Sequence, residues 1–362
     1  MKRSTIAATL ALLGLALVPT HAAFAGGAKA PAAPARHVVA FPADTAMHPS
    51  AGTEWWYFVG HLGDASGHVY GFETTFFKFS GLRRYFSGSP VDTAFRTDVA
   101  VTDEAANKFY NGVTYAPQSP LTRSSTTAVD LSAGTMRVRT VGTLAYHVQG
   151  AAPGANIDLT VRSTRPPMLV NHGYLGWGSG YTYYYSLTHM QAQGTITIGK
   201  RTVAVHGVVW NDHQWGNMSQ SNVQGWQWMA LQFADGTDTS LVQERPTTAA
   251  YARWSQTLTA AGTQLYDPKT SVTVLSYWRS PSTHIRYPSR WRVQIPAQRV
   301  DVTVSPTIEG QEVVDHFPVD KWLFSYWEGS ATFTGTREGK PASGKAYVEL
   351  TGYNTPPTTL SL

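Results

Sequence analysis

Residues 190–213, MQAQGTITIGKRTVAVHGVVWNDH, decide the fold prediction because apolar and polar side chains alternate along much of this stretch. Alternation with a period of two residues is typical of β-strands, since successive side chains point to opposite faces of a sheet. Outward from it, the chain continues as short alternating runs separated by Gly, Asp, Asn and Pro, and helical periodicity is almost absent. Many short, evenly spaced strands predict an all-β sandwich or barrel.

A second stretch repeats this pattern near the C-terminus. Residues 326–353, YWEGSATFTGTREGKPASGKAYVELTGY, again place a Gly before a Thr-rich strand, then a polar hairpin, then Gly-x-x-aromatic. The two segments that begin at Gly52 and Gln224 also correspond, because each runs from a Trp pair to a strand ending in Glu. Chance similarity between hairpins is the alternative. The repeat predicts two similar β-barrel domains in tandem.

The predicted organisation has four parts. They are a signal peptide (1–25), a flexible arm (26–40), an N-terminal domain (41–218) and a C-terminal domain (219–362). Two cations precede an apolar run at residues 6–18, and Ala23-Phe24-Ala25 offers the small-x-small pattern of a signal-peptidase site. An uncleaved anchor is the alternative, but the run is shorter than the roughly 20 residues a membrane span needs. We expect cleavage after Ala25, export to the periplasm or medium, and no transmembrane segment afterwards.

The composition narrows the class of partner. The net charge is +5, and losing Lys2 and Arg3 with the signal peptide leaves +5 − 2 = +3, scattered along the chain. That balance argues against nucleic acid as a partner. Aromatic residues make up 12% of the chain and charged residues 14%, which suits an aromatic, apolar cavity or an aromatic-rich β core. We expect an apolar small-molecule partner and a monomer or weak dimer.

Residues 207–217, GVVWNDHQWGN, carry the candidate catalytic residues. If this strand is extended, Asn211, His213 and Trp215 share one face while Asp212 points to the other. An imidazole buried between tryptophans suits an acid or base, because burial lowers its pKa. The alternative is a structural histidine bonded to a backbone carbonyl. We take Asp212, His213 and Trp215 as the catalytic candidates.

Further polar and aromatic residues are candidates for lining a ligand pocket, with a core role as the alternative: Glu54, Trp56, His172, Tyr184, Trp226, Trp228 and Gln232. Glu73 lies in an apolar strand, where a carboxyl must be paired or protonated, and Lys78, Arg83 or Arg84 could pair with either Glu54 or Glu73. The histidines show no metal-ligand spacing, cysteine is absent and no phosphate loop occurs. We therefore expect no metal and no cofactor.

Several motifs together resemble one family. The chain is similar to the AttH / carotenoid 1,2-hydratase superfamily of tandem lipocalin-like proteins over essentially its whole mature length. The motifs that carry the resemblance are HPSAGTEWWYFVGHL (48–62), GHVYGFETTFFKF (67–79), YYYSLT (183–188), WNDHQWG (210–216), GWQW (225–228) and YWEGSATFTG (326–335) with GKAYVELTGY (344–353).

The resemblance implies two lipocalin-like β-barrels with an apolar cavity near their interface. It also implies hydratase chemistry on isolated alkenes, or pericyclase chemistry on polyenes. In the hydratases an Asp-His-Asn-Trp-Gly stretch supplies a site His and Trp, which correspond here to His213 and Trp215. The chain departs from the pattern at Gln214 and Gln227, where the family commonly has acids, and it shows no Tyr-x-Asp after Trp228.

Three functional hypotheses follow. In the first, the protein binds a polyene, terpenoid or lipid-like molecule at the domain seam and acts on it as a hydratase, isomerase or hydrolase. Asp212 and His213 would be acid and base, while tryptophan faces (Trp215, Trp226 and Trp228) would stabilise positive charge. In the second, favoured by the glutamines, it is a carrier without chemistry. In the third, it is a pericyclase that needs only shape and a hydrogen-bond donor such as Tyr184 or Gln232.

Overall fold

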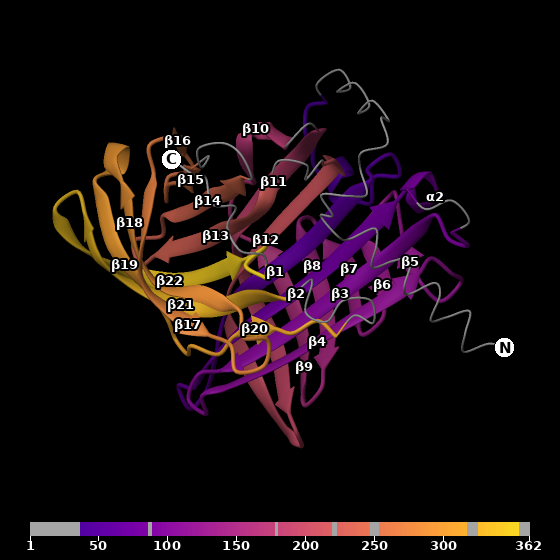
Figure 1. Cartoon of the computed structure of the whole chain (residues 1–362), viewed down its shortest axis with the longest axis horizontal. Coiled ribbons are helices and arrows are strands. Elements are labelled where there is room, and N and C mark those ends of the chain that lie inside the picture. The colour runs from indigo at the N-terminus through magenta and orange to yellow at the C-terminus, as the bar shows by residue number, and fades with distance from the viewer. Residues whose placement is uncertain are drawn as a thin grey trace.

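The structure, a computed structural model, describes residues 37–85, 89–177, 180–218, 223–246, 253–316 and 325–354. Nearly all of these residues form antiparallel β-strands (Figure 1). The short helices are η1 (Ala43–Thr45), α2 (Leu82–Tyr85) and η2 (Pro296–Gln298). In this described part of the chain, no helix is both long enough and apolar enough to cross a membrane.

The first sheet has twelve strands in the order β4-β3-β2-β1-β12-β11-β9-β8-β7-β6-β5, with β10 paired to β11. The strands are β1 (Thr53–Asp64), β2 (Val69–Ser80), β3 (Thr93–Asp103), β4 (Lys108–Pro117), β5 (Arg123–Ser124), β6 (Asp130–Ala133), β7 (Met136–Gly142), β8 (Ala145–Ala152), β9 (Ala155–Ser163), β10 (Met168–Trp177), β11 (Gly180–Ile198) and β12 (Arg201–Asn217). The sheet curls so that β3 contacts β8 across a shared core.

The second sheet has ten strands in the order β16-β15-β14-β13-β22-β21-β19-β18-β17, with β20 paired to β21. The strands are β13 (Val223–Phe233), β14 (Asp238–Pro246), β15 (Arg253–Leu258), β16 (Gln264–Asp267), β17 (Ser271–Arg279), β18 (Arg286–Ile295), β19 (Val300–Pro306), β20 (Glu312–Val313), β21 (Tyr326–Arg337) and β22 (Lys340–Leu350).

The two sheets repeat one topology, which confirms the prediction of tandem lipocalin-like domains. In the first sheet, opening strand β1 pairs with the last strand, β12, and β11 and β12 form a hairpin. In the second, opening strand β13 pairs with the last strand, β22, and β21 and β22 form a hairpin. These hairpins are the two repeated stretches of the sequence. The first sheet ends at Asn217 and the second begins at Val223.

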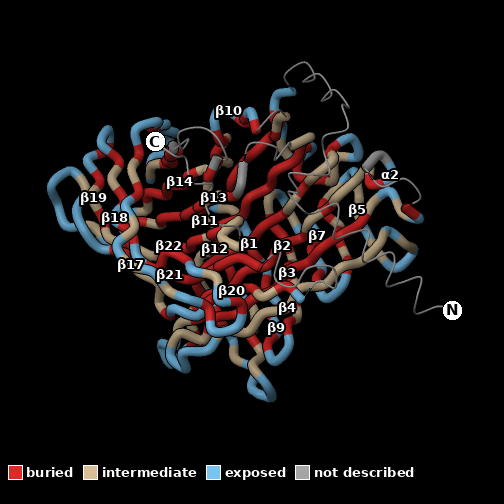
Figure 2. The backbone as a smooth tube through the Cα atoms, in the orientation of Figure 1, coloured by how far each residue is buried: buried red, intermediate tan, exposed pale blue. Residues whose placement is uncertain are grey.

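Each domain has its own apolar core, and a third cluster fills the seam between the sheets, where Figure 2 shows the central strands almost entirely buried. The seam cluster takes residues from both sheets, among them Tyr57, Tyr184, Trp210, Trp228, Trp254 and Tyr347. One cavity lies over β6 to β9 and β11, and a smaller one lies beside Tyr70 and Arg201, so both are on the N-terminal domain. The apolar cavity expected between the domains therefore stays a prediction.

The start of the chain's described part is ordered against the first barrel. The backbone N–H of His37 donates to the Tyr183 hydroxyl at 3.2 Å, and that of Ala40 donates to Asp44 at 2.6 Å. Residues 37–40 of the expected flexible arm are thus held in place. The rest of that arm and the expected signal peptide lie outside the described residues.

Gly207 of β12 sits directly against the backbone of β1. A Cβ atom there would lie 2.0 Å from the carbonyl oxygen of His61, a backbone atom that cannot move without breaking the strand pair. We expect Gly207→Ala to lower the free energy of unfolding by about 1–3 kcal/mol, the usual cost of overpacking. Urea unfolding measures it. Gly176→Ala is the control, because no atom lies within 4 Å of its Cβ position, and equal midpoints for the two variants would contradict the prediction.

Candidate functional site

Strand β12 divides the predicted catalytic residues between two places. His213 and Trp215 point into the first barrel, where Trp215 belongs to the N-terminal core. Asp212 points to the opposite face and joins the seam, where it accepts a hydrogen bond from Tyr184. The predicted alternation of faces is confirmed. The expectation that His213 itself faces the seam is wrong, because the side chains that it contacts line the barrel interior.

His213 is the centre of a buried polar cluster inside this barrel. Strand pairing places it beside Trp56 of β1 and Tyr185 of β11. Its Nε2 lies 3.0 Å from Oε1 of Glu54, and its Nδ1 lies 3.3 Å from the Tyr185 hydroxyl. Tyr185 is 1% exposed, and Glu54 and His213 are wholly buried. The three groups form a chain of carboxylate, imidazole and hydroxyl.

The protonation states of this chain follow from its surroundings. Burial lowers the pKa of His213 to about 4, against the opposing effect of Glu54. Burial acts to raise the pKa of Glu54, but hydrogen bonds with His213 and His48 and the Lys78 charge outweigh it and hold the pKa at about 2. At neutral pH the imidazole is neutral and the carboxyl ionised. Nε2–H therefore donates to Glu54, which leaves Nδ1 as an acceptor beside the Tyr185 hydroxyl, a group that also hydrogen bonds with Tyr146.

Aromatic rings enclose the imidazole. Trp56 stacks on His213 with ring centroids 4.5 Å apart, and Tyr185 meets it edge-on at 5.3 Å. Trp215 is covered by His48, whose ring lies parallel at 4.2 Å. Phe41 packs edge-on against Tyr185 at 4.8 Å. Exclusion of water by these rings strengthens every charge interaction inside the cluster.

Lys78 and the segment before β1 close the cluster. Lys78 Nζ donates to Oε2 of Glu54 at 3.2 Å and to the carbonyls of His48 at 2.7 Å and Ala51 at 3.0 Å. His48 Nδ1 lies 2.7 Å from Glu54 Oε1, and its Nε2 lies 3.3 Å from Asp44. The His48 side chain is 20% exposed, so this ring connects the buried cluster with the protein surface.

At the seam, Asp212 is held by three donors. Its carboxylate accepts from the Tyr184 hydroxyl at 2.5 Å, Ser186 Oγ at 2.6 Å and Trp210 Nε1 at 2.6 Å. Trp228 of the second sheet donates to the Tyr184 oxygen at 3.2 Å. Burial raises the pKa of Asp212 to about 6 although the three hydrogen bonds oppose it. The arrangement ties the two domains together and leaves Asp212 fully bonded.

Other carboxyls in the seam have few partners. Glu73 and Glu328 are wholly buried, and each has one oxygen without a hydrogen bond. Burial raises the pKa of both well above the usual range, and neighbouring carboxyls add to the effect. The Tyr57 hydroxyl donates to Glu328 at 2.7 Å. The ion pair expected for Glu73 is a wrong prediction, because Lys78 pairs with Glu54 instead and burial favours the protonated carboxyl of Glu73.

Glu349, in the same seam, should make stability depend on pH. Burial raises its pKa from 4.5 to about 7, against a 2.9 Å hydrogen bond from Trp226 Nε1. The folded state holds the Glu349 proton more tightly than the unfolded state does. The stabilisation that this proton gives is therefore lost as pH rises from about 4.5 to about 7. Glu349→Gln should therefore gain about 1–3 kcal/mol over wild type across this window, allowing for the carboxyl's partial exposure.

Urea unfolding at pH 5 and at pH 8 measures this gain. The matched control is Glu309→Gln, a substitution at an exposed glutamate, which should leave the pH dependence of unfolding unchanged. A Glu349→Gln variant whose stability follows the same pH curve as wild type would show that the seam does not hold this proton.

The two glutamines that depart from the family pattern have different surroundings. Gln227 accepts from Trp291 Nε1 at 3.0 Å and donates to Gln243 at 3.4 Å, so its amide is fixed inside the second domain. Gln214 donates to Met218 Sδ at 3.7 Å on the seam face of β12. Neither amide can supply a proton as a carboxylic acid would.

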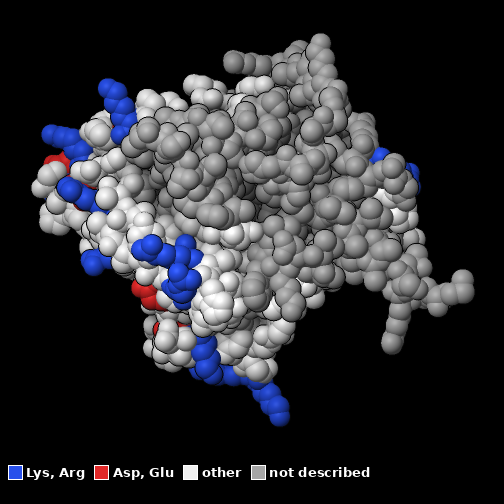
Figure 3. Space-filling view, viewed as in Figure 1, with Lys and Arg blue, Asp and Glu red and all other residues white. Residues whose placement is uncertain are grey.

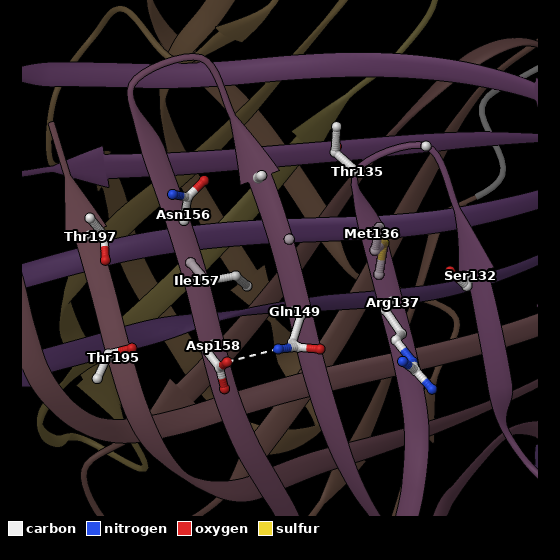
Figure 4. A pocket seen from close by; sticks show the side chains of 13 residues that line it. Ser132, Thr135, Met136, Arg137, Gln149, Asn156, Ile157, Asp158, Thr195 and Thr197 are labelled. Carbon is white, nitrogen blue, oxygen red and sulfur yellow. Dashed lines mark hydrogen bonds between the residues drawn. The ribbon is translucent and has the colours of Figure 1, made fainter.

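A cavity of about 440 Å³ lies over strands β6 to β9 and β11 (Figure 4), and His213 is not among its lining residues. The polar groups that line this cavity are hydroxyls, amides, Arg137 and Asp158. Asp158 is engaged by Gln149 at 2.8 Å and by His147 at 2.7 Å. It is an open surface groove with a mixed polar and apolar lining. On the part of the face that Figure 3 draws as described, Lys and Arg lie at several separate places.

The structure brings most of the predicted site residues into two groups. In the barrel are Glu54, Trp56, His213 and Trp215, and at the seam are Asp212, Tyr184, Trp226, Trp228 and Gln232. His172 joins neither group, because it is exposed on β10 with a left-handed φ of 61°. Two residues of the barrel cluster were not predicted as site residues: His48 and Lys78. Strand register identifies Tyr185 as the direct partner of His213.

Two lipocalin-like barrels in tandem, with an enclosed carboxylate–imidazole–hydroxyl chain in the first, define the class of protein. The chain belongs to the AttH-like family, whose family model matches residues 32–353.

Proteins named as a hydratase and a dehydratase are among those similar to this chain. An AttH candidate from Nitrosomonas europaea has a TM-score of 0.78 at 27% identity, over 90% of this chain and 100% of that one. Kievitone hydratase from Nectria haematococca has a TM-score of 0.71 at 19% identity, over 88% and 94%, a likeness of fold. Dehydratase asqC of Emericella nidulans is 25% identical over 216 residues, 56% of this chain. The chain spans about 60% of that relative's length.

Proposed function

We propose that the protein is a hydratase or dehydratase type of enzyme that acts on a small apolar molecule held in the first barrel. The observation that carries this proposal is the buried chain Glu54–His213–Tyr185, with Nε2 of the imidazole 3.0 Å from a carboxylate and Nδ1 3.3 Å from a hydroxyl. The names of the dehydratase and hydratase among the similar proteins agree with this class of reaction.

The hydrogen-bonded groups Glu54, His213 and Tyr185 are arranged to act together as a base. When the Tyr185 oxygen takes a proton from substrate or water, its own proton passes to Nδ1 of His213, and Glu54 stabilises the resulting imidazolium. The returning proton completes the addition or loss of water. The neutral imidazole and the ionised Glu54 are the states that this direction of transfer requires.

A base of this kind sets the substrate class. Protonation of an isolated alkene needs a strong acid, and a buried tyrosine with a raised pKa is a weak one. Removal of a proton beside a carbonyl, or activation of water for addition to a double bond conjugated with a carbonyl, needs a base near neutral pH. We therefore assign an activated double bond in an apolar molecule as the substrate. Phe41 packs on Tyr185, so substrate must take the place of that ring.

Deuterium incorporation tests the proposal. The enzyme is incubated in deuterated water with benzalacetone, an apolar enone, and with limonene, an isolated alkene. We expect water addition or deuterium at the α-carbon of the hydrated enone, and no change in limonene. Deuterium in limonene alone would favour acid chemistry and overturn the assignment of a base. No reaction with either probe, together with tight binding of both, would favour a carrier.

A carrier without chemistry is the second candidate. Gln227 favours it, because an amide fixed by Trp291 and Gln243 stands where the resemblance leads one to expect an acid. In that case an apolar molecule would co-purify with the protein unchanged, which native mass spectrometry would detect. A new carbon skeleton without deuterium would instead favour a pericyclase.

Export of the protein is also part of the proposal. Lys2 and Arg3, the apolar run at residues 6–18 and Ala23-Phe24-Ala25 support it. The N-terminal sequence of protein purified from its own host tests this, and we expect it to begin at Gly26. A chain that retains residues 1–25 would refute cleavage.

A further inference from the structure

We propose that His48, Glu54 and His213 bind one divalent transition-metal ion of the zinc class. Within the described ranges, these three residues each offer a ligand atom, and the three atoms lie within 4.8 Å of one another. Oε1 of Glu54 lies 2.7 Å from Nδ1 of His48 and 3.0 Å from Nε2 of His213. An ion held about 2.0–2.2 Å from each ligand places neighbouring ligand atoms roughly 3–3.5 Å apart. Small side-chain shifts would therefore admit it.

The far nitrogen of each histidine is already held as metal-binding histidines usually are. His48 Nε2 lies 3.3 Å from the carboxylate of Asp44, and His213 Nδ1 lies 3.3 Å from the Tyr185 hydroxyl. Such partners fix the orientation of the ligating ring. Trp56 and Trp215 add to this by stacking on the two rings. The ligands are thus pre-oriented on both sides.

The two oxygens of Glu54 have different partners, because Lys78 binds Oε2 while the two imidazoles lie beside Oε1. Its ammonium lies 3.2 Å from Oε2 and also donates to the carbonyls of His48 and Ala51. The backbone N–H of His48 lies 3.0 Å from the same oxygen and 3.1 Å from Oε1. Oε1 therefore faces the two imidazoles and can serve as the ligand, while Lys78 offsets the charge at Oε2.

The donor set determines the kind of ion. Two imidazoles and a single carboxylate oxygen suit zinc, cobalt, iron or copper, whereas magnesium and calcium prefer oxygen ligands throughout. Three protein ligands leave a fourth tetrahedral position, which is typical of open zinc sites. His48 is the ligand nearest to solvent, with its side chain 20% exposed, so the ion would enter beside it.

Metal binding would switch off the proton relay, an effect that rests on the proposed function. In the metal-free state Nε2 of His213 lies 3.0 Å from Glu54 and Nδ1 lies 3.3 Å from the Tyr185 hydroxyl, the arrangement that the proposed relay needs. Coordination through Nε2 requires the proton to move to Nδ1, which then donates to the Tyr185 oxygen. An imidazole in that tautomer cannot accept the tyrosine proton. The ion would act as an inhibitor of this site.

Titration of the full chain with Co²⁺ and Zn²⁺ tests the site directly. We expect one ion per chain by calorimetry and the visible absorption of four-coordinate Co²⁺. His48→Asn keeps an N–H donor near Glu54 but removes a ligand, so affinity should fall roughly 10-fold or more. His37→Asn is the matched control, because His37 bonds Asp44 from outside the cluster at 2.6 Å and should leave affinity unchanged.

The outcomes separate this proposal from the proposed function. Failure of wild type to bind either ion at micromolar concentration, or equal affinity in His48→Asn, would overturn the metal site. If Zn²⁺ binds and slows the enone reaction in wild type but not in His48→Asn, both site and inhibition are supported. Binding without inhibition refutes the inhibitory role alone. If wild type binds the metal ion but reacts with neither benzalacetone nor limonene, the metal site is supported and the proposed function fails.

Discussion

Replacing His213 with glutamine is expected to slow the enone reaction by roughly 10²–10⁴-fold, the usual contribution of a positioned base. Glutamine fills similar space and can hydrogen bond to Glu54 or Tyr185, but it cannot accept a proton. The imidazolium that Glu54 would stabilise can no longer form, so proton transfer from Tyr185 stops. Deuterium exchange into the α-carbon, followed by nuclear magnetic resonance in deuterated water, measures the loss.

His61→Gln provides the matched control for this loss. His61 is also a buried histidine, on β1, but it faces the seam, where its Nε2 lies 3.1 Å from Ser330 Oγ. Its substitution removes a buried imidazole without touching the relay, so exchange should stay within a few-fold of wild type. Equal losses in the two variants would mean that His213 supports only the fold. A His213→Gln variant as fast as wild type would remove it from the reaction.

Much of the fold was predictable from the sequence because strand alternation and the duplicated hairpins are local patterns. The stretch 190–213 indicated the hairpin that became β11 and β12, and its copy indicated β21 and β22. Alternation also separated His213 from Asp212. It could not tell which face of β12 meets the other domain, since that depends on how two curled sheets dock. The sequence therefore led us to place His213 at the seam.

The site was less predictable because its partners are distant in sequence. Glu54 and His213 are 159 residues apart, and only the pairing of β1 with β12 brings them together. The segment that carries His48 is irregular, so no periodicity shows that its ring stacks on Trp215. Lys78 was recognised as a partner for either Glu54 or Glu73, and the register of β1 with β2 settles the choice, because Lys78 lies directly opposite Glu54.

We expect Lys78→Met to lower the free energy of unfolding by about 3–5 kcal/mol, the cost of removing one partner of a buried ion pair. Lys78 is 2% exposed and Glu54 is wholly buried, so water cannot replace the lost ammonium. The carbonyls of His48 and Ala51 also lose their donor. Urea unfolding measures the change. Lys108→Met, at an exposed lysine on β4, should cost no more than about 0.5 kcal/mol.

A double variant decides whether charge or packing causes this loss. Glu54→Gln with Lys78→Met removes both charges, so no unpaired charge stays in the barrel. The double variant should therefore cost about 1–3 kcal/mol less than the sum of the two single variants. Additive costs, within about 0.5 kcal/mol, would mean that Lys78 stabilises the barrel through its aliphatic chain and carbonyl contacts. Coupling of the expected size would instead show that the lysine charge stabilises the ionised carboxylate of Glu54.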